Sequence, residues 1–157
     1  MGQIIVVLAS PILTRLYTPD DFGVLAIYIS ILGVLSVVAS WRYETAIPLP
    51  EKDEDAANLL ALSLYIVLFM TVVVGIVTWF LGNEIVRLTN APALQSYLWL
   101  LPVGIILIGT YQVLNNWAVR KQAFGKLAKT KLYQGLGVVL TQIGLGVLRL
   151  GPFGLLI

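Results

Sequence analysis

The sequence predicts an all-α fold, a polytopic transmembrane helix bundle of about five spans followed by the start of a sixth. Of the 157 residues, 59% are hydrophobic and only 11% are charged, whereas a soluble domain carries roughly a quarter charged residues. The charged residues also fall between long uncharged runs, as expected for spanning helices of about 20 apolar residues. We therefore expect residues 1–157 to form a single transmembrane domain.

The first predicted span, residues 2–14, is short for a bilayer. No positively charged segment precedes it and no small-x-small cleavage site follows, so it is typical of a helix rather than a signal peptide. At the other end, a new apolar run starts at 152. We expect the chain to be an amino-terminal fragment of a larger protein, with helices missing at both ends.

The second predicted span, residues 22–46, follows TRLYTPDDFG at 14–23, where charge and proline interrupt the apolar sequence. Thr18 suits the N-cap, Pro19 suits the first helical position, and Asp21 completes a capping box with Thr18. Acid–base catalysis by the paired aspartates would need a nucleophile or a third polar group, and neither accompanies them. The stretch therefore predicts a tight turn that begins a helix.

Three further spans follow, each on a long uncharged stretch. They cover residues 57–82, 93–118 and 132–149.

The basic residues predict the orientation of these spans. The loop at 119–131 is rich in lysine and arginine, so the positive-inside rule makes it cytoplasmic. Alternation then places the loop at 48–55 on the same side, and the loops at 14–21, 83–92 and 149–152 outside. The basic residues expected inside are Arg42, Lys52, Arg120, Lys121, Lys126, Lys129 and Lys131, and those expected outside are Arg15, Arg87 and Arg149.

The composition excludes several kinds of chemistry. There is no His and no Cys, which removes disulfides, thiol nucleophiles, imidazole bases and Cys/His metal sites. No cofactor and no metal are expected. The net charge is only +2, and no Lys/Arg cluster with interleaved aromatic residues suggests nucleic acid as a partner.

Amide side chains crowd the inner half of the span at 93–118. They are Gln112, Asn115 and Asn116. An amide in hydrocarbon needs a hydrogen-bond partner or water. Two interpretations stay open: the amides bond to neighbouring helices, or they line a water-filled cavity and bind a polar substrate.

Arg42 and Glu44 stand at the inner end of the second span, where charges usually face a cavity or a partner. Two residues apart on a helix, their side chains diverge by about 200° and are not expected to pair. Arg42 either snorkels to the interface or contacts an anionic headgroup or a substrate phosphate. Arg15 either caps the end of the first helix or contacts lipid phosphates.

Four segments, in order along the chain, carry a family resemblance. They are SPILTRLYTPDDFGVLAIY, WRYETAIPLPEKDEDAANLLALS, NNWAVRKQAFGKLAKTKLYQGLGVVLTQIGLG and GPFGLLI. They resemble the amino-terminal part of bacterial polysaccharide biosynthesis membrane proteins, the O-antigen (lipid-linked oligosaccharide) flippases of the multidrug/oligosaccharidyl-lipid/polysaccharide exporter superfamily. The resemblance covers the whole chain, and the RLYTPDDFG turn and the RYE segment are its most specific parts.

This resemblance implies a two-lobe transporter, of which the chain supplies part of one lobe. It implies that an undecaprenyl-pyrophosphate-linked oligosaccharide moves across the bacterial inner membrane by alternating access. Family cavities are lined by cationic side chains that suit the pyrophosphate, and this role carries over to Arg42, Arg15 and Arg120. Gln112, Asn115 and Asn116 would bind sugar hydroxyls.

The expected protein is therefore a multi-pass inner-membrane transporter and not an enzyme. Its expected partners are the lipid bilayer, the lipid-linked oligosaccharide and polysaccharide polymerase or assembly proteins. The alternatives are an exporter of another amphipathic substrate in the same superfamily, an inactive truncated fragment and a membrane glycan polymerase. The short outer loops and the lack of His count against the polymerase.

Overall fold

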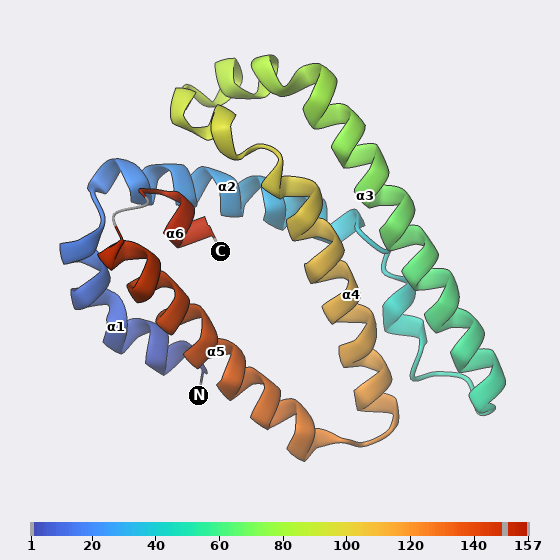
Figure 1. Cartoon of the computed structure of the whole chain (residues 1–157). Helices are drawn as coiled ribbons and strands as arrows, with labels where there is room; N and C mark the ends of the chain where they lie inside the picture. The colour runs from blue at the N-terminus through green and yellow to red at the C-terminus, as the bar shows by residue number, and fades with distance from the viewer. Residues whose placement is uncertain (1, 149–150, 157) are drawn as a thin grey trace. The chain divides into compact units, whose positions relative to one another are not determined.

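The described part of the chain consists of helices, as the sequence predicts, and contains no strand (Figure 1). A computed structural model describes residues 2–148 and 151–156, and only the backbone of residues 2–6, 8, 124, 126 and 128. Contacts divide the chain into two units. The central unit is Ile29–Phe124, and the terminal unit comprises the described residues of 1–28 and 125–157.

The terminal unit joins helices from opposite ends of the sequence. Its elements are α1 (Gly2–Leu16), the first half of α2 (Pro19–Val38), nearly all of α5 (Phe124–Val147) and α6 (Phe153–Leu156). A buried cluster of side chains from α1, α5 and α6 forms its core, together with Tyr17, which follows α1. The cluster contains Ala9, Leu13, Tyr17, Val139 and Leu155.

The turn between α1 and α2 confirms the capping box predicted from TRLYTPDDFG. The Thr18 amide and hydroxyl donate to Asp21 Oδ2 at 2.8 and 2.9 Å, and the Asp21 amide donates to Thr18 Oγ1 at 3.3 Å. These bonds satisfy donors that a helix N-terminus otherwise leaves open. Pro19 takes the first helical position, where no N–H is needed.

The central unit is built on a helical hairpin. Its elements are the second half of α2, η1 (Tyr43–Ala46), α3 (Asp53–Thr89), η2 (Pro92–Tyr97) and α4 (Leu100–Arg120). Helices α3 and α4 lie side by side along much of their length (Figure 1). A Cβ atom at Gly109 of α4 would lie 2.7 Å from Val67 Cγ1 of α3. The missing side chain therefore permits the close approach of the two helices.

The second predicted span is shorter than expected. Residues 22–46 were expected to form one helix, but α2 ends at Val38 and the short 3₁₀ helix η1 follows after a turn. Trp41 and Arg42 have positive φ angles of 49° and 60°. A left-handed residue does not continue a right-handed helix, so the chain changes direction here.

Helix α3 is longer than its predicted span of 57–82, because polar residues extend it at both ends. Acidic residues fill its first turn, where they favour a helix N-terminus. At the other end, an ion pair of 2.8 Å joins Glu84 and Arg87, three residues apart on one face. The helix ends at Thr89, and its C-cap is Asn90, which has a left-handed φ of 51°.

The helices α4 and α5 also differ from the predicted spans 93–118 and 132–149. Helix α4 begins only at Leu100, because η2 occupies the preceding residues. Helix α5 begins at Phe124, so most of the predicted 119–131 loop is helical. The end of the last span falls on Arg149, which lies outside the described residues. The start predicted at 152 agrees with α6.

Two of the described helices, α2 and α3, are long and apolar enough to cross a membrane, with mean hydropathies of 2.2 and 2.7. Helix α1 has only 15 residues, α4 contains three amide side chains in its second half, and α5 has three lysines among its first eight residues. The count of five spans and the start of a sixth therefore stays a prediction.

Candidate functional site

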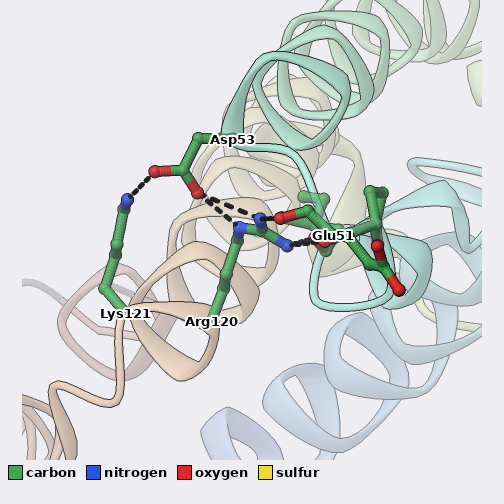
Figure 2. A network of polar contacts seen from close by, with 6 residues as sticks. Glu51, Asp53, Arg120 and Lys121 are labelled. Carbon is green, nitrogen blue, oxygen red and sulfur yellow. Dashed lines mark hydrogen bonds and ion pairs between the residues drawn. The ribbon is translucent and has the colours of Figure 1, made fainter.

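Arg120 and Lys121, at the C-terminal end of α4, hold the segment that leads into α3. The Arg120 guanidinium donates from Nε and Nη2 to Asp53 Oδ1 at 3.1 and 3.0 Å, and Lys121 Nζ lies 2.6 Å from Asp53 Oδ2. Figure 2 shows the carboxylate of Asp53 between the two cations. We call these three residues the inner clamp.

The remaining N–H groups of the Arg120 guanidinium bond to backbone carbonyls of the segment between η1 and α3. Its Nη1 donates to the carbonyls of Pro50 and Ile47, and its Nη2 also donates to the carbonyl of Glu51 at 3.4 Å. The Arg120 side chain is only 10% exposed. Arginine suits this place because its planar fork presents five donors, whereas lysine offers a single point of charge. One side chain therefore fixes the whole connection between η1 and α3.

The clamp changes the acidity of its carboxyl group. Asp53 stands before the uncharged run of α3, and its side chain is 64% exposed. Hydrogen bonds from Lys121 and then Arg120, with their positive charges, lower the pKa of Asp53 below its ordinary value. The carboxylate is thus held in its charged form.

The three amides predicted in the inner half of the span lie on α4, and the side-chain oxygens of two of them lack a hydrogen-bond partner. Gln112 Oε1 and Asn115 Oδ1 are buried and accept no hydrogen bond from the described residues. Asn116 differs, because its Nδ2 donates to the Gln112 backbone carbonyl at 3.0 Å. The helical spacing places Gln112, Asn116 and Arg120 in one row, each four residues after the last. Gln112 and Asn116 therefore share one face of α4 with Arg120 of the inner clamp.

Arg42 lies outside any helix, contrary to its expected place at the end of a long span. It is exposed and precedes η1. Glu44 is buried, and the hydroxyl of buried Ser40 donates to its carboxylate. No ion pair joins Arg42 to Glu44 in the structure described, which agrees with the prediction that they do not pair, although the expected helix does not exist.

The predicted cations do not form one group. Arg42 and Arg120 belong to the central unit, whereas Arg15 belongs to the terminal unit, where it is exposed in the last turn of α1. That position suits a cation at a helix C-terminus, which was one of its two expected roles. The structure brings Gln112, Asn115, Asn116 and Arg120 together on α4 alone.

An apolar cavity of about 290 Å³ lies within the central unit, lined by the second half of α2, by α3 and by α4. Its lining includes Leu35, Met70 and Ile105, and Thr78 is its one polar residue. The Thr78 hydroxyl already donates to carbonyls of its own helix at 2.9 Å. The cavity offers hydrocarbon contacts and no charged group.

Asp53 is the functional candidate that sequence reasoning missed. It lies 67 residues from Arg120 in the chain, so no local spacing links the two. The available indication was charge: the acidic segment at 48–55 and the basic segment at 119–131 were both predicted on the cytoplasmic side. The contact confirms that these two segments lie at the same end of the hairpin.

Among residues 2–148 and 151–156 there is no group of three or more acidic, His or Cys side chains that suits a metal ion.

Comparison with known proteins decides the family. The model of a family described as "Polysaccharide biosynthesis protein" matches residues 12–157. The chain belongs to this family. No curated protein and no solved structure matches the chain.

Membership confirms the family that the RLYTPDDFG and RYE segments indicated. Together with the apolar helices α2 and α3, it points to a membrane protein with a role in polysaccharide biosynthesis. The family description names no substrate and no reaction.

Proposed function

We propose that this chain is part of a flippase that moves undecaprenyl-pyrophosphate-linked oligosaccharide, such as an O-antigen unit, across the bacterial inner membrane. The mechanism is alternating access, in which packed bodies of helices reorient around a site at membrane depth. Family membership supports the link to polysaccharide. The further spans that a multi-pass transporter needs are part of the proposal.

The observation that carries the proposal is the pair of unpartnered amide oxygens on α4. A buried acceptor without a donor destabilises the fold by about 1–3 kcal/mol. We therefore infer that these oxygens accept hydrogen bonds from a ligand. Sugars are rich in hydroxyl groups, which donate to such oxygens. Gln112 and Asn115 lie three residues apart on one helix face, so both oxygens become accessible to one glycan when the surrounding helices separate during alternating access.

The other predicted contacts take different parts in this proposal. Arg42 and Arg15 are exposed, and each is free to meet a phosphate at a membrane surface. Asn116 donates to the Gln112 backbone carbonyl within α4 and leaves the Gln112 side chain free of that bond. Arg120 meets phosphate only if Asp53 gives way. Polymerase or assembly proteins are the proposed partners, and the chemistry of the described residues suggests transport rather than catalysis.

The test replaces the two amides by apolar groups of similar size, Gln112→Met and Asn115→Leu. Removing an unpartnered acceptor is expected to leave stability unchanged or raise it by about 1 kcal/mol. The same change is expected to abolish glycan export. Export is measured by complementation of a flippase-deficient strain, with analysis of the surface glycan, and stability by thermal unfolding of purified protein.

Gln95→Met is the matched control, since Gln95 is exposed and bonds Asn83 Oδ1 at 3.0 Å. It is expected to preserve export. Normal glycan in the double variant Gln112→Met/Asn115→Leu would contradict the proposal. A gene that does not complement the flippase defect but restores export of another amphipathic compound would favour the second superfamily function.

A further inference from the structure

The inner clamp contains the donor set of a phosphate site. Nε and Nη2 of Arg120 point to one oxygen of Asp53, and Lys121 Nζ points to the other. A guanidinium edge beside an ammonium group is the combination with which proteins hold phosphate oxygens. The Asp53 carboxylate occupies the place of the anion (Figure 2).

The Arg120 side chain is fixed independently of this carboxylate. The carbonyls of Ile47, Pro50 and Glu51 take hydrogens of Nη1 and Nη2, on the far side of the guanidinium from the Lys121 ammonium. Its burial, with 10% of the side chain exposed, limits other orientations. If the Asp53 carboxylate moved away, the Nε–Nη2 edge of the guanidinium would therefore keep its orientation and would be available to bind another anion.

The carboxylate itself is accessible to competitors. The Asp53 side chain is 64% exposed and that of Lys121 is 46% exposed. Ion pairs of such exposure are weak, because water and salt compete with them. A pyrophosphate group carries more negative charge than a carboxylate, and every phosphate group offers more oxygens, so phosphate is a suitable competitor.

We propose that Arg120 and Lys121 form a phosphate-binding site that Asp53 blocks from within the chain. A phosphate group that displaces Asp53 releases the N-terminus of α3 from the end of α4, while the carbonyls near Glu51 stay bound to Arg120. This inference deepens the proposed function, since the pyrophosphate of a lipid-linked glycan is one source of the phosphate and a lipid headgroup is the other.

Trp117 provides a reporter within the chain. Lys121 Nζ lies 5.3 Å from the centre of the Trp117 ring, so displacement of the ammonium group alters the surroundings of the indole. In a variant with Trp41, Trp79 and Trp99 replaced by Phe, the remaining fluorescence comes from Trp117. The whole chain in phosphatidylcholine nanodiscs is titrated with sodium pyrophosphate.

Asp53→Asn is expected to bind pyrophosphate about fivefold more tightly than the parent, since an exposed pair reduces a competitor's affinity by about that factor. Glu84→Gln is the matched control. It removes the same charge from an exposed ion pair on the same helix, and it is expected to leave the affinity at the parent value. Equal affinities of Asp53→Asn and Glu84→Gln would overturn the proposal.

Lys121→Gln tests the cationic side without disturbing the backbone bonds of Arg120. Because Lys121→Gln also removes the ammonium group beside Trp117, its binding is measured by titration calorimetry. It is expected to weaken pyrophosphate binding in the Asp53→Asn background, and unchanged binding would also overturn the proposal. A parallel series uses phosphatidylglycerol nanodiscs without pyrophosphate. A response to the lipid alone supports a headgroup as the source of phosphate, and a response in phosphatidylcholine to added pyrophosphate supports the substrate. Binding is measured without transport, so loss of glycan export would not affect this result.

Discussion

Tyr17 in the terminal unit and Arg120 in the central unit each hold a connecting segment against a helix, but Tyr17 does so as a buried side chain and Arg120 partly through an exposed ion pair. Tyr17 is 5% exposed, and its hydroxyl donates to the Gln142 carbonyl at 2.6 Å. Arg120 acts through charge, against a carboxylate that is largely in water. Contacts of the first kind depend on shape, and those of the second kind depend on salt and pH.

The surroundings of Tyr17 show how closely that region is packed. A Cβ atom at Gly146 would lie 2.9 Å from Tyr17 Cε2, and one at Gly154 would overlap the Tyr17 hydroxyl and lie 2.8 Å from Leu145 Cβ. The Gln142 side chain in turn donates to the Leu155 carbonyl at 3.2 Å. The space around Tyr17 therefore has no room for an added methyl group at Gly146 or Gly154, whereas the clamp lies partly in solvent.

The largest expected effect comes from adding such a methyl group. Gly154→Ala is expected to destabilise the protein by about 2–3 kcal/mol, because the new Cβ meets Tyr17 and Leu145 in a filled space. Thermal unfolding in detergent measures this loss. Gly137→Ala is the control, since a Cβ there meets nothing within 4 Å, and it is expected to be neutral or slightly stabilising.

A second variant separates shape from hydrogen bonding in the same place. Tyr17→Phe alone is expected to cost about 1 kcal/mol, the value of one hydrogen bond. In the double variant Tyr17→Phe/Gly154→Ala the overlapping oxygen is absent. Its loss of stability is therefore expected to be smaller than the sum of the losses in the two single variants. Simple additivity would show that the hydroxyl is not what the methyl group meets.

A smaller loss of stability than that of Gly154→Ala is expected at the clamp. Arg120→Ala is expected to destabilise the protein by about 1–2 kcal/mol, since backbone carbonyls lose their donors. Arg120→Lys is expected to be intermediate, because one ammonium group cannot reach both Asp53 and the carbonyls. Arg87→Ala is the control: Arg87 is 75% exposed, and its loss should stay within about 0.5 kcal/mol. Equal losses of stability in Arg120→Ala and Arg87→Ala would show that the contacts of Arg120 contribute no more than an exposed ion pair.

The smallest effect is the pH dependence of Asp53. Its pKa is lower in the folded protein than in the unfolded chain, so its contribution is present above the unfolded pKa. That contribution is lost as the pH falls through the folded pKa. The stability difference between the parent and Asp53→Asn should therefore be constant from pH 8 to about 5 and shrink below about 4. Unfolding temperatures of both proteins across this range measure it, and a difference that persists at low pH would contradict the contact.

Local features of the fold were predictable from sequence. Thr18, Pro19 and Asp21 determine the start of α2 through bonds within four residues. The break after Val38 was not predictable, because no glycine or proline marks it in residues 34–47. It depends on left-handed backbone at Trp41 and Arg42 and on burial of Glu44, which only the folded central unit provides.

The same distinction applies to the candidate site. The sequence was enough to place Gln112, Asn115 and Asn116 together in the inner half of one predicted span. It did not reveal which of them would lack a partner, since that depends on the atoms packed around α4. The family resemblance assigned Arg120 to the substrate phosphate. It gave no sign of the Asp53 carboxylate, because the bond to Asp53 joins two segments that meet only in the hairpin.

As a membrane-spanning helix, which the proposed function requires, α3 would not match the thickness of a bilayer. Its uncharged part, residues 56–83, is helical throughout and at 1.5 Å per residue measures about 42 Å. The hydrocarbon layer of a bilayer is about 30 Å thick. The resulting hydrophobic mismatch requires α3 to tilt or the lipids beside it to stretch. With charged residues at both ends of the helix, its stability should vary with the length of the acyl chains that surround it.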